Sequence, residues 1–154
     1  MKIDKPSTVG FPSLDANTSY QLWLAANCLQ RAFRKGLVPL RLTFVQFFVL
    51  AAVSRITAEQ EASSQAEVCR FCDMDANMIS QVVKAMAAKG LLIRSESRTD
   101  RRVFNLTLTP VGETLLIAAH ERMLPISASF FAPLGERRLE LTEMLRRVLA
   151  AQER

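Results

Sequence analysis

Residues 64–112 read SQAEVCRFCDMDANMISQVVKAMAAKGLLIRSESRTDRRVFNLTLTPVG, and a change of hydrophobic period inside this stretch decides the fold. At its start Ser64 and Glu67 form a capping box, which predicts the beginning of a short helix. A tight turn rich in capping residues follows, and a second helix is expected over about 76–89, with Gly90 ending it. Two helices joined in this way are typical of a helix-turn-helix.

After Gly90 the hydrophobic period changes from that of a helix to that of a strand. Residues 92–97 and 103–108 are expected to form two strands, because apolar and polar side chains alternate along them. Thr109-Pro110 then begins another helix, with Thr as the cap and Pro at the first helical position. The sequence therefore predicts a helix-turn-helix followed by a β-hairpin wing.

The regions on both sides of this stretch predict further helices. Residues 1–17 show no periodicity and are interpreted as an extended arm. Helices are expected over about 18–38, 43–56, 110–131 (bent at Pro125) and 135–151. The expected fold is mainly α with a small β-hairpin wing. Residues 18–154 are expected to form a single chain fold. In it, a winged helix-turn-helix lobe at 40–109 is flanked by dimerisation helices at 18–38 and 110–151.

The terminal helices carry more apolar surface than one small lobe needs. Residues 115–119 read LLIAA, and leucine, methionine and valine recur along 141–149. This pattern predicts burial against a second copy of the chain, in a homodimer.

The composition excludes several classes of function. The chain has 154 residues with 49% hydrophobic and 23% charged content, three cysteines and a single histidine. One histidine rules out a Cys/His-rich zinc cage, and no Gly-rich phosphate loop, HExxH or GxSxG motif is present. We therefore expect no enzyme activity, no catalytic or metal-binding residue and no cofactor. The longest apolar run, Phe47–Val53, is too short for a membrane span, and no signal peptide is apparent, which predicts a soluble cytoplasmic protein.

The charge distribution favours an anionic partner for one part of the chain. The net charge is +5 and the isoelectric point is about 9.6. Residues 113–154 carry six basic and six acidic side chains, so the excess of positive charge lies before them. Contacts with double-stranded DNA are accordingly expected from the helix-turn-helix and the wing.

The helix over 76–89 is the candidate for reading the DNA major groove. With its apolar side chains buried, Asn77, Ser80, Gln81 and Lys84 are left outside. Short polar side chains can reach base edges, and glutamine can pair with adenine, whereas Lys84 suits a phosphate. Met78 is interpreted either as a contact to a thymine methyl group or as a partly buried side chain. A merely solvated polar face is the alternative for the whole set.

The chain resembles the MarR family of bacterial transcription regulators over about 19–150. The resemblance rests on seven short words in the right order and spacing: Leu42-Thr43 with Gln46, Ser64–Val68, Met86 with Lys89–Leu91, Arg94, Asp100–Arg102, Leu108-Thr109 and Gly112. It implies a homodimer that binds a pseudo-palindromic operator as a repressor. It also implies a small-molecule or oxidant signal that weakens DNA binding.

The wing tip is the second expected DNA contact. Arg98, Arg101 and Arg102 outnumber Asp100 there, and a protruding arginine suits the narrow minor groove of A·T-rich DNA. The resemblance implies that Arg102 enters the groove while Asp100 supports it, which leaves Arg98 and Arg101 for phosphates. A solvated charged turn is the alternative.

The resemblance also implies a cavity for a small aromatic acid between the dimer helices and the lobe. Arg55 or Arg31 would balance the charge of the acid's carboxylate. The alternative is that the aromatic side chains simply pack in the core. The candidate lining residues are Trp23, Phe47, Phe48, Arg55 and His120.

Two alternatives remain for the function. Cys28 and the CxxC word Cys69–Cys72 allow a thiol-based oxidant-sensing regulator of the same fold, although core packing is the simpler interpretation. A winged-helix module that binds another protein would use the same surface without contacting DNA.

Overall fold

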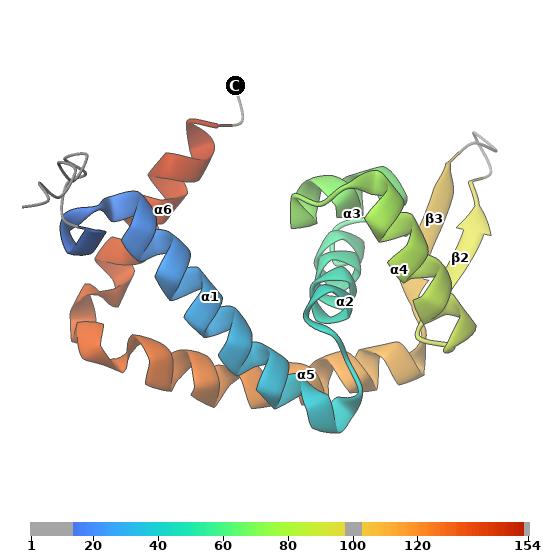
Figure 1. Cartoon of the computed structure of the whole chain (residues 1–154). Coiled ribbons are helices and arrows are strands. Elements are labelled where there is room, and N and C mark those ends of the chain that lie inside the picture. Colours follow the sequence, from blue (N-terminus) through green and yellow to red (C-terminus); the bar gives the residue numbers. More distant parts are fainter. Residues whose placement is uncertain (1–13, 98–102, 153–154) are drawn as a thin grey trace, which may run out of the picture.

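The computed structural model describes residues 14–97 and 103–152. Their order of elements matches the expected helix, helix, helix-turn-helix, hairpin, helix, helix (Figure 1). The helices are η1 (Leu14–Ala16), α1 (Thr18–Leu37), η2 (Val38–Leu40), α2 (Phe44–Thr57), α3 (Gln65–Cys72), α4 (Ala76–Ala88), α5 (Pro110–Phe131), η3 (Ala132–Arg137) and α6 (Arg138–Ala150). The strands are β1 (Ser63–Ser64), β2 (Leu92–Glu96) and β3 (Phe104–Leu108).

Capping chemistry fixes where the lobe helices begin and end. The expected capping box of Ser64 with Glu67 is present at α3, and Thr43 with Gln46 forms another at α2. Gly90 adopts the left-handed conformation after α4 with a φ of 69°, which a residue without Cβ tolerates best. The helix boundaries in this region were thus predictable from local sequence.

Two boundaries near the termini differ from the prediction. The end of the expected arm is folded, because η1 forms a turn and the side chain of Asn17 caps α1 by accepting from Tyr20 N. The last helix begins at Arg138 instead of 135. Gly135 takes a non-helical conformation (φ 53°, ψ −131°) and kinks the chain inside η3, just before α6.

The sheet has three strands instead of the expected two. Strand β1 lies directly before α3, where no strand was expected, and the strand order is β1-β3-β2, with both pairs antiparallel. Ser63 is fully buried and its Oγ donates a hydrogen bond to the carbonyl oxygen of Leu106 at 3.1 Å. Two serines carry no strand signal of their own, so tertiary pairing with β3 created this strand.

The hydrophobic core lies inside the lobe, around α2. Val49, Leu50 and Val53 of α2 have no exposed surface, and they belong to one cluster with Ile79 of α4 and Leu106 of β3. Helix α2 is therefore buried at the centre of the lobe.

Helix α5 runs along the molecule from the lobe to the opposite end, where α6 and the start of α1 lie (Figure 1). Its first turn touches the lobe so closely that a Cβ on Gly112 would lie 2.1 Å from the carbonyl oxygen of Leu91. No residue of α6 is buried, and the only buried residue of α1 is Leu37.

No single described helix is long and apolar enough to cross a membrane. Only the segments Thr18–Leu40 and Phe44–Thr57, taken together, have sufficient length and apolar content, and the chain bends by 83° at the break between them.

Candidate nucleic-acid interface

The outward face of α4 carries the side chains expected to read DNA. Asp75 caps the helix, since its Oδ1 accepts from Asn77 N at 2.8 Å and from Met78 N at 3.1 Å. Asn77, Gln81 and Lys84 are exposed and Ser80 is half-buried. All four expected residues thus lie on one helix whose first turn is held by its cap.

Burial explains why these side chains point outward. Ile79, Val83 and Met86 have no exposed surface and attach α4 to the core. Asn77, Gln81 and Lys84 follow at steps of four and three residues, so they share the opposite side of the helix. Within the described part of the chain, none of these three side chains has a hydrogen bond or ion pair. Their donors and acceptors are free for an external partner.

The strands of the wing lie beside α4 (Figure 1). The guanidinium of Arg94 in β2 lies 3.3 Å from the centre of the Phe104 ring in β3, a cation–π contact that ties the two strands together. The Nε of Arg94 is buried and has no hydrogen-bond partner among the described residues. The sequence showed Arg94 only as part of a motif. The register, which sets Arg94 opposite Leu106 and diagonal to Phe104, was not visible in it.

The wing-tip residues Arg98, Asp100, Arg101 and Arg102 lie outside the described residues. Their expected roles in the minor groove and on phosphates therefore stay predictions.

None of the main hollows in the described single chain is lined by more than one of the five residues expected to form a ligand pocket. Trp23 is 61% exposed and stacks on Tyr20, with ring centres 6.0 Å apart. Phe47 is buried and its ring contacts that of the half-buried Phe48. His120 is exposed on α5.

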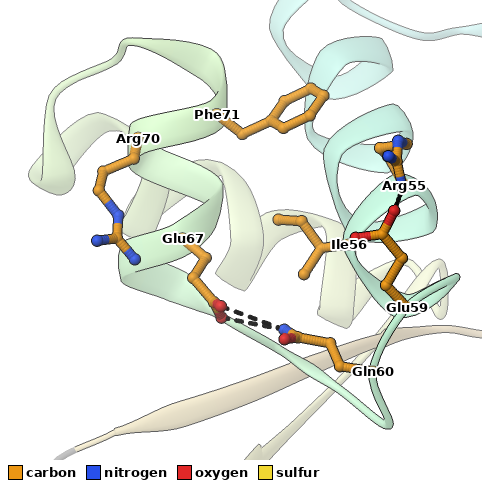
Figure 2. Close-up of a pocket in the computed structure, with 7 residues that line it drawn as sticks. All are labelled: Arg55, Ile56, Glu59, Gln60, Glu67, Arg70 and Phe71. Carbon is orange, nitrogen blue, oxygen red and sulfur yellow. Dashed lines mark hydrogen bonds and ion pairs between the residues drawn. The ribbon is translucent and has the colours of Figure 1, made fainter. Parts of the chain in front are cut away.

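Arg55 lies instead beside a hollow of about 460 Å³ between the end of α2 and α3 (Figure 2). Its guanidinium forms an ion pair with Glu59 at 2.6 Å, so its charge is already balanced. Across the hollow, the Nε2 of Gln60 donates to both carboxylate oxygens of Glu67, at 3.2 and 3.3 Å. Hydrogen bonds from the backbone and side chain of Ser64 hold the pKa of Glu67 below its ordinary value.

The cysteines of the CxxC word are packed against the core. Cys69 and Cys72 are half-buried, and the Sγ of Cys72 points at the carbonyl oxygen of Phe48 at 3.7 Å. Burial raises the pKa of both thiols, and the charge of Asp75 adds to the effect at Cys69. A raised pKa lowers the fraction of reactive thiolate, which disfavours these two thiols as sensors.

Cys28 lies apart from them on α1, where the Nη2 of Arg31 donates to its Sγ at 3.1 Å. Over residues 14–97 and 103–152, no group of three or more His, Cys, Asp or Glu side chains is placed to hold a metal ion.

An apolar groove of about 500 Å³ opens at the end of the molecule away from α4. Helix α1, the end of α5 and α6 form its walls, which include Leu22, Phe131, Met144 and Val148. Met144 and Val148 are more than half exposed, as is Leu139 nearby on α6. We call this surface the terminal groove.

Known proteins share this architecture. The model of the MarR family matches residues 42–103. The uncharacterized HTH-type transcriptional regulator YdcH of Bacillus subtilis (strain 168) is 31% identical over 122 residues, which span 79% of this chain and 83% of YdcH.

Two solved structures place the same elements in the same way. One concerns the regulation of DNA binding of Bordetella bronchiseptica BpsR by 6-hydroxynicotinic acid; its TM-score is 0.80 at 26% identity, over 90% of this chain and 97% of that one. A mutant MarR from E. coli complexed with operator DNA has a TM-score of 0.78 at 16% identity, over 90% and 99% of the two chains. Because the sequence, the helix-turn-helix with its wing and the long terminal helices all agree, this chain belongs to the MarR family of DNA-binding transcriptional regulators.

Proposed function

We propose that this chain is a cytoplasmic homodimeric repressor that binds a pseudo-palindromic operator through α4 and the wing and leaves it when a small aromatic acid binds. The observation that carries the proposal is the exposed polar face of α4, where Asn77, Gln81 and Lys84 have no partner among the described residues. This face carries two amides and an ammonium group, which suit binding to a partner, so we propose a binding role and no catalysis.

The chemistry of the face suits the major groove. The amides of Asn77 and Gln81 can each present a donor and an acceptor to adenine, and the charge of Lys84 suits a phosphate one turn further along. In this proposal the wing arginines Arg98, Arg101 and Arg102 contact the neighbouring minor groove and phosphates, with Asp100 supporting them.

The terminal groove supports the homodimer. An open apolar surface of this kind is unfavourable in water, and a second copy presenting the same surface would cover it. Two copies would place two α4 helices on one side of the duplex, separated by about one DNA turn, roughly 34 Å. The operator would then have two-fold symmetry.

The effector proposal rests on the relative BpsR, whose DNA binding is regulated by 6-hydroxynicotinic acid. Trp23 and His120 are exposed, so a second copy could complete a pocket with Phe47, Phe48 and Arg55. Such an acid would need a cation beyond Arg55, since Arg55 already pairs with Glu59. Arg31 is the other candidate.

The test is selection of duplexes from a random pool, followed by footprinting with the purified protein. We expect a two-fold site protected on one side of the duplex. Gln81→Ala should reduce discrimination at one base pair per half-site by about 1–3 kcal/mol, and Arg102→Ala should lower affinity and reduce the salt dependence. Arg137→Ala, a matched change of an exposed arginine near α6, should leave both properties unchanged.

Two outcomes would contradict the proposal in different ways. A protein that enriches no duplex, and whose weak binding to random DNA does not fall with salt, would favour a protein-interaction module. Release from the operator by a hydroperoxide, lost when Cys28, Cys69 and Cys72 are all serine, would favour the thiol-based sensor.

A further inference from the structure

We propose that Met78 reads the C5-methyl group of a thymine in each half-site, and this inference rests on the proposed binding of α4 in the major groove. Met78 is the third residue of α4 and its side chain is 42% exposed. It stands among the polar residues Asn77 and Gln81, on the face that has no partner within the described chain.

The core does not account for the exposed position of Met78. Ile79, Val83 and Met86 already attach α4 to the core with no exposed surface. Met74, four residues earlier, packs against that core, whereas Met78 does not belong to the cluster or to the side chains packed on it. The fold therefore gains little from an apolar side chain at this position.

The proposed dimer does not account for it either. The helix segments that form the terminal groove lie at the far end of the molecule from α4 (Figure 1), so a second copy seated there would leave α4, and Met78 with it, uncovered. An exposed apolar side chain in this position is available for a partner that approaches α4 itself.

The chemistry of the major groove identifies that partner. Thymine is the one base that presents a methyl group there, and side chains near the start of a recognition helix reach the base edges. The hydrogen bonds from Met78 N and Asn77 N to Asp75 hold the first turn of α4 in place. Gln81 lies three residues further on the helix, so the two side chains are neighbours and would contact adjacent bases.

Replacing thymines by deoxyuridine tests this proposal, because uracil keeps the hydrogen bonds of thymine and lacks only the methyl group. The selected operator is prepared with each thymine replaced in turn. We expect one position per half-site at which replacement weakens binding about fourfold, the factor that burial of one methyl-sized group gives.

The Met78→Gln variant keeps the length of the side chain and removes its apolar end. It should bind the thymine and uracil operators equally at that position, while its thermal unfolding midpoint stays unchanged because Met78 lies outside the core. Gln81→Ala is the matched control from the same face. It should lower affinity and preserve the fourfold preference for thymine.

The inference is overturned if no thymine responds to replacement, or if Met78→Gln keeps the preference for thymine. Both results would leave the proposed DNA binding intact. Failure to select any duplex would instead contradict the proposed function, and this inference with it.

Discussion

The winged lobe and the terminal helices are stabilised in different ways. In the lobe, α2, α4 and the sheet enclose a core whose side chains are almost fully buried. Helix α6 has no buried residue, and Leu139, Met144, Val148 and Leu149 are each more than half exposed. The lobe is complete within one chain, whereas the apolar side chains of α6 lie exposed on it.

The ion pairs of α6 do not compensate for its exposed apolar side chains. Glu143 of α6 pairs with Arg146 and Arg147, and all three side chains are largely exposed. Exposed pairs of this kind contribute little to stability, so they do not replace the missing core.

The largest expected effect comes from breaking the contact between the lobe and α5. In Gly112→Ala the new Cβ would meet the carbonyl oxygen of Leu91 at 2.1 Å, so backbone would have to move. We expect the free energy of unfolding to fall by about 3 kcal/mol, measured by urea denaturation. The control Gly90→Ala meets no atom within 4 Å and should cost about 1 kcal/mol, from its positive φ alone. Equal losses for the two variants would show that α5 adjusts freely on the lobe.

A charge in the terminal groove should separate the two copies without unfolding the lobe. Val148→Glu places a carboxylate among apolar side chains at a position that is 55% exposed in the single chain. We expect monomers in analytical ultracentrifugation and operator affinity about a hundredfold lower, because linkage of the two half-site contacts is lost. Thr142→Glu puts the same charge on α6 outside the groove and should remain dimeric. A dimeric Val148→Glu protein would remove the terminal groove from the interface.

The cysteines offer a smaller contrast within the lobe. Because burial raises the pKa of Cys69 and Cys72, less thiolate is present at pH 8. In variants that retain one cysteine each, we expect both to react with iodoacetamide about tenfold more slowly than a free thiol. Reaction as fast as the free thiol would favour a sensing role for the CxxC word.

The smallest effect concerns pH. The pKa of Glu67 is lowered in the folded state. The ionised carboxylate therefore stabilises the fold fully above the ordinary pKa of 4.5, and this stabilisation is lost as pH falls through the pKa of the folded state. We measure the free energy of unfolding by urea denaturation at pH 6 and at pH 3. Between these two values it should fall by about 1 kcal/mol less in Glu67→Gln than in the unchanged protein. Glu143→Gln, which alters only the exposed pairs of α6, should follow the unchanged protein. Identical acid dependence of both variants would mean that the cap at α3 is insensitive to its charge.

Local sequence was sufficient for the lobe helices and the face of α4. The capping pairs Thr43–Gln46 and Ser64–Glu67 and the spacing of Ile79, Val83 and Met86 predicted where helices begin and which side is buried. These signals are local, because a cap and a helical period involve residues only three or four positions apart.

Tertiary contacts decided the features that the sequence left open. Strand β1 exists because Ser63 and Ser64 pair with β3 more than forty residues away. Arg94 lies on Phe104 because the register of β2 and β3 sets Arg94 opposite Leu106, two residues from Phe104. The exposure of Met78 was likewise settled by which neighbours fill the core around α4. Such outcomes depend on the packing of distant segments, whose energies no local pattern of residues encodes.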